Sequence, residues 1–292
     1  MRTFGVDVSH WEGYIDWKTA ARWIPFVYYK ATDGIGHVDN TFTYNRDQCN
    51  LLGIPHAPYH YYQTERDPVA QANWFIETVG TQYKRYILDL EDPPASSLQA
   101  TPNLENPSAI LHQIAPDIRA FLQRCEQLTG IKPAIYTSPG YWNEFVKPKP
   151  TWCRNYDLLV AHYTIAHTPA IPIGWDAYTI WQFSENYYFP GCISAADGDW
   201  FNGDLGQVRA WFGNHRQVDP PFYSHTRLRS LFNGLHVRRS PDVKSREVDH
   251  LNKGDQVELE NLGEKDVWVR HSKGWSCIEK DDYRYMEIVK DE

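Results

Sequence analysis

The chain has 292 residues, enough for one large domain and a smaller one. Its formal net charge of −8 argues against general binding of nucleic acids or anionic membranes, and no apolar run is long enough to span a bilayer. The five cysteines show neither metal-ligand spacing nor a disulfide framework. We therefore expect reduced thiols, no metal and no other cofactor.

Short apolar runs alternate with helical patterns through the first two thirds of the chain. Strands are expected at residues 4–8, 26–32, 57–62, 86–89, 133–137, 158–163 and 178–183, with 193–201 as the candidate last strand. Helices are expected at residues 41–52, 67–79 and 110–128, each followed by a glycine that ends it. This alternation predicts an α/β fold, an irregular TIM-like (β/α) barrel of parallel strands in which several helices are short or missing.

The fourth of these strands ends in two acidic residues, Asp89 and Glu91. Side chains alternate faces along a strand, so both carboxyl groups point the same way. Pro93 and Pro94 then stop the strand. Such a pair suits acid/base chemistry, because mutual repulsion raises at least one pKa and lets that group hold a proton near neutral pH. An isolated Asp-x-Glu is more often a pair of solvated loop acids, so the neighbouring residues decide between the two interpretations.

Other strands of the predicted barrel also end in polar residues, at the edge where TIM-type barrels place their catalytic groups. These residues are Asp7, Lys30, His60, Thr137, His162 and Gln182. Asp7 would equally suit a structural hydrogen-bond acceptor at the barrel mouth. An all-oxygen cluster of Asp7, Asp89, Glu91 and Asp197 would suit Mg²⁺ or Ca²⁺, but no loop supplies the carbonyl-rich spacing of such sites, so we expect no metal.

The pattern changes after residue 213. A polar segment containing Asp219-Pro220-Pro221 leads into short strand signals at close spacing, separated by turns. From Arg227 onward the net charge is only −1, so this part would not be repelled by an anionic surface. We expect a catalytic barrel over residues 1–213, a linker over 214–227 and a small all-β barrel over 228–292.

Together these residues resemble glycoside hydrolase family 25, the muramidases also called Chalaropsis-type lysozymes. The resemblance spans residues 1–213 and rests on motifs in the family's order, namely Phe4–Ser9, Gly13–Trp17, Lys30–Gly34, Asp39–Phe42 with Asn45, Tyr59–Tyr61, Asp89–Glu91, Trp181–Phe183 and Asp197–Gly203. Glu12, Asp33 and Pro58 depart from the family's usual residues. The C-terminal part resembles bacterial SH3-type domains through Leu235–Pro241, Lys253–Asp255 and Gly274–Trp275. Such domains often bind cell walls.

The resemblance implies hydrolysis of the β-1,4 bond between N-acetylmuramic acid and N-acetylglucosamine in bacterial peptidoglycan. Glu91 matches the family's general acid/base and Asp89 its carboxylate partner. Asp7 and Asp197 match the two flanking aspartates; Asp199 is a second candidate for the last position, but Phe201 follows Asp197 at the family's spacing. Four aromatic residues are candidates for stacking on sugars, although each would also suit barrel packing: Tyr59, Tyr61, Tyr136 and Trp181.

In this mechanism Glu91 protonates the leaving oxygen and then acts as base on water. Asp89 either attacks the anomeric carbon or orients the substrate's 2-acetamido group for internal attack; the adjacent positions on one strand favour the second role and retention of configuration. No cofactor and no obligatory protein partner are implied. The start of the chain shows no signal peptide. This fits a phage endolysin, cytoplasmic until its release, or a secreted antimicrobial enzyme whose leader was removed.

Two other function classes fit the same residues. One is a different barrel glycosidase, for example of the chitin-cleaving type, which the polymer that is cleaved would distinguish. The other is a non-catalytic wall-binding protein on an inactive barrel. The presence of both Asp89 and Glu91 argues against the latter.

Overall fold

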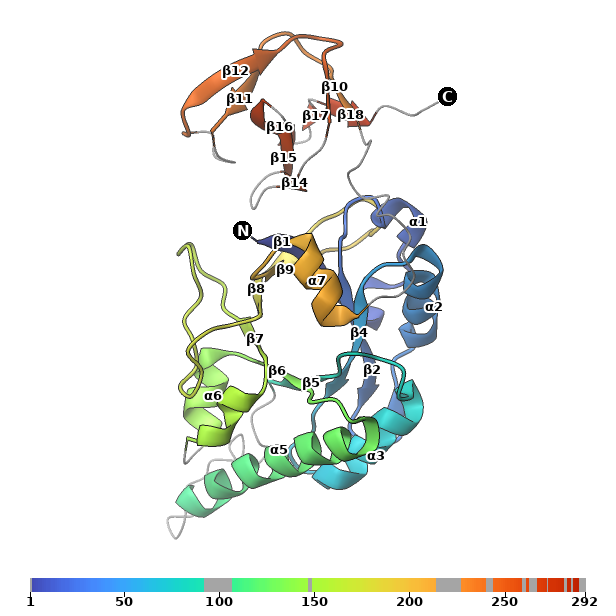
Figure 1. The fold of residues 1–292 in the computed structure, drawn as a ribbon, viewed down its shortest axis with the longest axis vertical. Coiled ribbons are helices and arrows are strands. Elements are labelled where there is room, and N and C mark those ends of the chain that lie inside the picture. Colours follow the sequence, from blue (N-terminus) through green and yellow to red (C-terminus); the bar gives the residue numbers. More distant parts are fainter. Residues whose placement is uncertain are drawn as a thin grey trace. The chain divides into compact units, whose positions relative to one another are not determined.

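The computed structural model describes residues 2–91, 107–146 and 149–213, and in the C-terminal part 227–239, 244–258, 261–262, 267–271, 273–280, 283–284 and 286–288. The chain divides into two compact units (Figure 1). One comprises Met1–Ala20 and Ile24–Arg216, and the other comprises Ala21–Trp23 and Gln217–Glu292.

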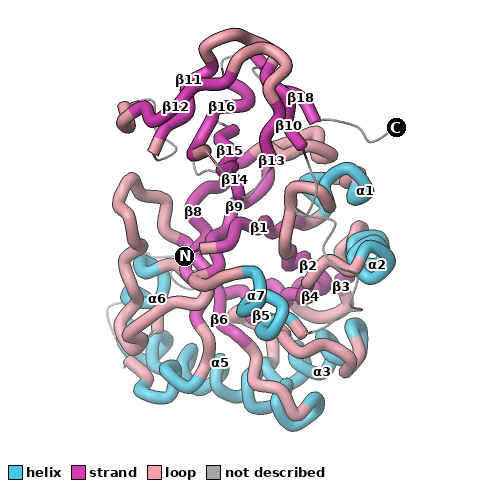
Figure 2. Tube along the Cα trace, turned by 45° about the horizontal axis from the view of Figure 1, so that its top comes forward, coloured by secondary structure: helices cyan, strands magenta, loops and turns pink. Residues whose placement is uncertain are grey.

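The first unit is a closed eight-stranded barrel, and Figure 2 shows helices along part of its outer side. Its strands follow the order β1-β9-β8-β7-β6-β5-β4-β2, and the parallel pairing of β1 with β2 closes the ring. Their bounds are β1 Thr3–Val8, β2 Val27–Asp33, β4 His56–Tyr61, β5 Ile87–Leu90, β6 Ala134–Thr137, β7 Leu158–Ala161, β8 Ile180–Tyr187 and β9 Ala196–Phe201. A short strand, β3 (His37–Val38), extends β2 as a hairpin. The closed barrel confirms the α/β prediction.

Strand β9 corrects the expectation that all barrel strands are parallel, because it runs antiparallel to both of its neighbours. The reason is the short connection: only residues 188–195 separate β8 from β9, whereas a parallel crossover needs about a dozen residues or more. The other seven strands run parallel to one another. Strand β9 therefore begins at the edge where the others end, and Asp197, its second residue, reaches that edge.

The long helices follow the predicted pattern. Helices α2 (Phe42–Leu52), α3 (Pro68–Val79) and α5 (Pro107–Thr129) lie where helices were expected, and α3 and α5 pack side by side outside the barrel (Figures 1 and 2). The side chain of Asp67 accepts the Ala70 N–H, as its position before Pro68 predicted. Among the described residues, no helix combines the length and apolarity that a membrane crossing requires.

Short helices complete the barrel wall. They are η1 (His10–Glu12), α1 (Trp17–Ala20), α6 (Pro139–Phe145), η2 (Thr151–Asn155) and α7 (Leu205–Phe212). Residues 162–179, between β7 and β8, contain no helix, which is the irregularity that the sequence predicted. Helix α7 was not expected, although its start shows a capping box in which Asp204 and Gln207 bind each other's backbone N–H groups.

The barrel interior is apolar at one end. Phe26, Phe201, Val208 and Phe212 belong to a buried cluster in which α7 packs against the ends of β2 and β9. The ring of Phe26 occupies the space that a side chain at Gly5 would need, with ring atoms about 2.4 Å from an added Cβ, so this position requires glycine. Because apolar side chains fill this end, the polar side chains of the same strands gather at the opposite one.

The second unit is built of strands, and its described residues contain no helix. A three-stranded sheet has the order β13-β10-β18; the other has the order β12-β11-β16-β15-β14, with β17 also paired to β16. Their bounds are β10 Arg227–Ser230, β11 Leu235–Arg238, β12 Glu247–Leu251, β13 Gln256–Glu258, β14 Asn261–Leu262, β15 Val267–His271, β16 Gly274–Lys280, β17 Tyr283–Arg284 and β18 Met286–Ile288. The unit has a small core of its own that includes Leu228, Val237, Leu251, Val257 and Met286.

Candidate active site

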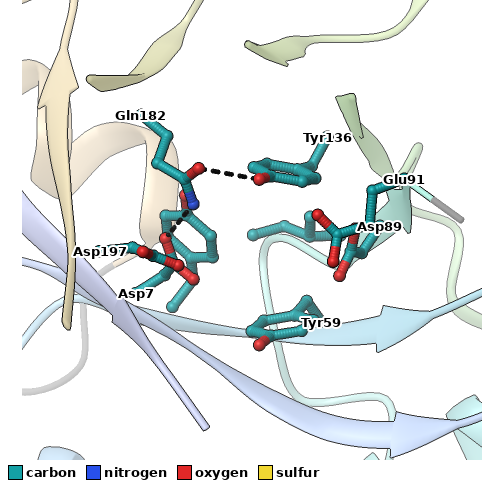
Figure 3. Close-up of a pocket in the computed structure, with 9 residues that line it drawn as sticks. Asp7, Tyr59, Asp89, Glu91, Tyr136, Gln182 and Asp197 are labelled. Atoms are coloured by element: carbon teal, nitrogen blue, oxygen red, sulfur yellow. Dashed lines mark hydrogen bonds between the residues drawn. The ribbon is translucent and has the colours of Figure 1, made fainter. Parts of the chain in front are cut away.

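Strand β5 brings the acidic pair to the polar edge of the barrel. Ile87 belongs to the inner cluster, and Asp89, two residues on, faces the same interior. Asp89 is 6% exposed, whereas Glu91, directly after the strand, is exposed. Both carboxyl groups point into the same pocket (Figure 3), as the alternation predicted. Pro93 and Pro94 lie outside the described residues.

The pocket at this edge draws its walls from seven of the eight strands. It is lined by Asp7, Tyr28, Tyr59, Ile87, Asp89, Glu91, Tyr136, Gln182 and Asp197. Figure 3 shows Asp89 and Glu91 on one side and Asp7 and Asp197 on the opposite side. All four acids singled out from the sequence are therefore neighbours of one pocket.

Gln182 links Asp7 to the hydroxyl groups of two tyrosines at the pocket. Its Nε2 donates to Oδ2 of Asp7 over 2.8 Å, and its Oε1 accepts the hydroxyl groups of Tyr136 at 2.8 Å and Tyr163 at 2.7 Å. Because both hydroxyl groups bind the same oxygen, the amide is held with its N–H toward Asp7. The proton of the Tyr136 hydroxyl is engaged by Gln182, so its oxygen is left to accept from a ligand.

Burial and repulsion raise the pKa values of the acids on this side. Burial first, and then the charge of Asp199, raise the pKa of Asp7 well above its ordinary value. Burial, followed by the charge of Asp7, raises the pKa of Asp197 to about 9. Near neutral pH, Asp197 is therefore protonated and can donate a hydrogen bond to a ligand.

The raised pKa of Asp197 predicts a stability that depends on pH. A carboxyl group whose pKa is higher in the folded state stabilises the fold below the unfolded value, and this contribution is lost as the pH rises through the folded value. The window for Asp197 runs from the ordinary pKa of an aspartate, 3.8, to its raised pKa of about 9. We expect Asp197→Asn to raise the melting temperature by about 2–4 °C near pH 8, and to change it little near pH 3, measured by circular dichroism.

Asp16 provides a control for which the expected change in melting temperature has the opposite sign. Hydrogen bonds from the Thr19 side chain and N–H lower the pKa of this exposed acid. Asp16 therefore stabilises the fold at pH values above the pKa that it has in the unfolded chain. Asp16→Asn should for this reason lower the melting temperature near pH 8. Parallel curves for Asp197→Asn and the wild type across the whole pH range would contradict the role of Asp197.

The four aromatic candidates divide into two groups. Tyr59 and Tyr136 line the pocket, with their rings on opposite sides of it in Figure 3. Tyr61 lies at the end of β4 outside the pocket lining, and its ring lies 4.1 Å from Nζ of Lys30. Stacking of Tyr61 on a sugar at the barrel rim stays a prediction.

Trp181 requires a correction. Its neighbour Gln182 faces the interior, so alternation turns Trp181 to the outside of the barrel. The indole is 3% exposed, and its Nε1 donates to the carbonyl of His162 over 2.8 Å. Its ring therefore packs in the barrel wall and is not available to a sugar.

Two residues that line the pocket, Tyr28 and Gln182, were not predicted as part of the site, and Asp199, the second candidate for the last acid, lies outside the pocket lining. Tyr28 lines the pocket, and its inward direction follows from its alternation with Phe26 in β2. Gln182 was noted only as a polar strand end. Asp199 lies deeper than Asp197 and is fully buried; no sequence signal distinguished its depth. No group of three or more His, Cys, Asp or Glu side chains among the described residues is arranged to hold a metal ion.

A barrel whose polar edge holds two facing pairs of acids between tyrosine rings has the groups that glycosidic bond cleavage requires, which defines the class as a glycoside hydrolase. The sequence model described as glycosyl hydrolases family 25 matches residues 6–192. The chain belongs to this family.

Individual relatives and a solved structure are similar to this chain over the barrel and agree with the family assignment. Lysozyme M1 of Streptomyces globisporus is 27% identical over 217 residues, 72% of this chain and 71% of the relative. An N,O-diacetylmuramidase of Arthroderma benhamiae is 28% identical over 219 residues, 70% of this chain and 84% of the relative. The crystal structure of a lysozyme from Streptomyces coelicolor is similar with a TM-score of 0.64 and 26% identity, covering 74% of this chain and 99% of that one.

Proposed function

We propose that this enzyme is a muramidase, a lysozyme that hydrolyses the β-1,4 bond between N-acetylmuramic acid and N-acetylglucosamine in peptidoglycan. The observation that carries the proposal is the pocket in which Asp89 and Glu91 face Asp7 and Asp197 (Figure 3). The similarity to lysozymes and diacetylmuramidases over the barrel supports this substrate.

Glu91 acts as the general acid/base. It is the exposed member of the pair at the pocket mouth, where the oxygen between two sugar rings can approach. It donates a proton to the leaving oxygen as the bond to the anomeric carbon breaks. It then removes a proton from the water that attacks the same carbon.

Asp89 acts from the buried position behind Glu91. Its carboxylate accepts the N–H of the 2-acetamido group, so that the acetamido oxygen attacks the anomeric carbon and forms a cyclic intermediate. Water opens this intermediate from the face that the leaving sugar left. Two successive inversions give net retention, as in substrate-assisted glycosidases.

Asp7, Asp197 and the two tyrosines hold the sugar. Protonated Asp197 donates a hydrogen bond, whereas Asp7 is held in place by Gln182. The rings of Tyr59 and Tyr136 on either side of the pocket supply flat apolar surfaces for a sugar ring. The oxygen of Tyr136 is left to accept from a sugar hydroxyl or amide group.

Product analysis tests this function. Purified peptidoglycan is digested, the new ends are reduced with borohydride, and the fragments are identified by mass spectrometry. Muramitol ends are expected. Glucosaminitol ends would make the enzyme a glucosaminidase, cleavage of chitin alone would make it a chitin-type glycosidase, and the absence of new ends would indicate a non-catalytic wall-binding protein.

We also propose that the C-terminal unit is an SH3-type domain that binds the cell wall. Its separate sheets and core support an independent unit, and its net charge of −1 would not repel it from an anionic wall. A catalytic barrel with a wall-binding domain would serve a phage endolysin released from the cytoplasm or a secreted bacterial enzyme equally.

We expect residues 217–292, fused to a fluorescent protein, to sediment with purified cell walls. The fusion starts before the expected boundary because β10 begins at Arg227 and pairs with both β13 and β18. Residues 1–216 should still cleave soluble glycan fragments but bind whole walls less than the full chain. Equal wall binding by residues 1–216 and the full chain would contradict the proposal.

A further inference from the structure

One tryptophan is exposed at the polar edge of the barrel. Trp11 is 78% exposed, and among the tryptophans whose side-chain burial the structure describes it is the only exposed one. It belongs to η1, which follows β1, the strand that carries Asp7 into the pocket. Tryptophan side chains are highly buried on average. An indole ring with most of its surface in water presents a flat apolar face to a ligand at this edge.

The ring of Trp11 is supported by the imidazole of its neighbour His10. The centroids of the two rings lie 4.6 Å apart, with 34° between their planes. The imidazole is itself fixed, because its Nδ1 donates to Oδ2 of Asp39 over 2.7 Å and the same oxygen accepts the backbone N–H of His10. Asp39 is buried, and its other oxygen accepts the N–H and the hydroxyl of Thr41. The support under the indole is therefore anchored in the barrel wall.

The backbone that carries Trp11 is also held in one conformation. The hydroxyl of Ser9 accepts the N–H of Trp11, and the carboxylate of Glu12 accepts the N–H of Ser9 over 2.6 Å, which completes a capping box. Gly13 ends the turn with a φ of 66° and donates its N–H to the carbonyl of His10. Because turn and imidazole are already ordered, a ligand that stacks on Trp11 orders few further groups.

Two observations place this ring beside the catalytic pocket. Trp11 follows Asp7 by four residues, which can span at most about 14 Å. Burial first, and among the neighbouring charges also that of Glu12, raise the pKa of Asp7 and of Asp197. Such an effect weakens with distance, so Glu12 lies close to both acids. Helix η1 therefore borders the side of the pocket that carries Asp7 and Asp197.

We propose that Trp11 binds a sugar ring of the glycan strand outside the catalytic pocket, next to the sugar that the pocket holds. The apolar C–H face of the sugar packs on the indole, and its hydroxyl groups stay in water. Neither partner needs a charge for this contact. The proposal rests on the muramidase function above, because it adds a binding position for the same substrate beyond the four acids and two tyrosines of the pocket.

Trp11→Ala tests the proposal through the length of the substrate. On an eight-sugar peptidoglycan fragment we expect kcat/KM to fall about 3–10-fold, the effect of one lost aromatic contact. On the shortest fragment that the wild type cleaves it should change little, because that fragment does not reach Trp11. Trp11→Phe retains a ring and should restore most of the rate on the long fragment. The melting temperatures should barely change, because the side chain is exposed.

Leu51→Ala is the matched control. It removes another exposed apolar side chain, near the end of α2 that leads to the start of β4 and so lies away from the polar edge. This variant should leave kcat/KM unchanged on both fragments. Equal losses by Trp11→Ala on the short and the long fragment, or no loss on either, would overturn the role of Trp11. Weaker binding of whole walls without a length-dependent loss would indicate a different occupant of this surface and would also overturn it.

A binding measurement separates this proposal from the muramidase function. Full-length Glu91→Gln is titrated with a chitin hexasaccharide, which presents the same kind of ring face without muramic acid. We expect a change in tryptophan fluorescence that is lost when Trp11→Ala is added. Binding that is equally strong with and without Trp11 would contradict the proposal. Binding that depends on Trp11, together with a wild type that forms no muramitol ends, would reject only the muramidase assignment.

Discussion

Glu91→Gln should lower the rate of wall lysis by about 10²–10⁴-fold, the loss expected when a general acid/base is removed. Glutamine keeps the size and hydrogen-bonding reach of the side chain but has no proton to give to the leaving oxygen. KM should change little, because the walls formed by Tyr59, Tyr136 and the other acids remain. The rates are measured by loss of turbidity of cell walls and by release of reducing ends.

Stability provides the control for this variant. Glu91 is exposed, so its replacement should barely change the melting temperature. Glu144→Gln, at an exposed position on α6, removes the same charge away from the pocket lining and should keep full activity. Near-native lysis by Glu91→Gln would remove Glu91 from the mechanism.

Asp89→Asn should reduce kcat by about 10²–10³-fold, as removal of a preorganised electrostatic group commonly does. In the substrate-assisted route, Asp89 balances the positive charge that develops as the acetamido oxygen attacks. Asparagine retains the shape but not the charge. Asp89 is 6% exposed, so melting curves must show that the variant is folded before its kcat is interpreted.

The configuration of the first products tests the same assignment in the wild type. Asp89 and Glu91 lie on one side of the pocket, so we expect retention and early β-anomers in proton NMR spectra. An inverting enzyme places its base across the sugar, roughly 6.5–9.5 Å from the acid. An initial α-anomer would therefore make Asp7 or Asp197, on the opposite side, the catalytic base and reduce Asp89 to electrostatic support.

Features that depend on a few neighbouring residues were determined by the sequence itself. Asp67 and Pro68 begin α3, and Gly80 follows its end, because caps and left-handed glycines act within one helical turn. Asp89 and Glu91 share a face because strand alternation is local. The order of the family motifs was likewise visible in the sequence, and with it the glycoside hydrolase class.

The depth and direction of the side chains in the pocket were determined by closure of the barrel. The short connection after β8 had already reversed β9, and its pairing with β1 in the closed ring brought Asp197 to the pocket and buried Asp199 below it. Closure of the barrel also determined which face of β8 points inward. Gln182 therefore links Asp7 to two tyrosines, and Trp181 points outward. The residues that meet here come from strands far apart in the chain, and only the ring of strand pairings sets their depth and direction.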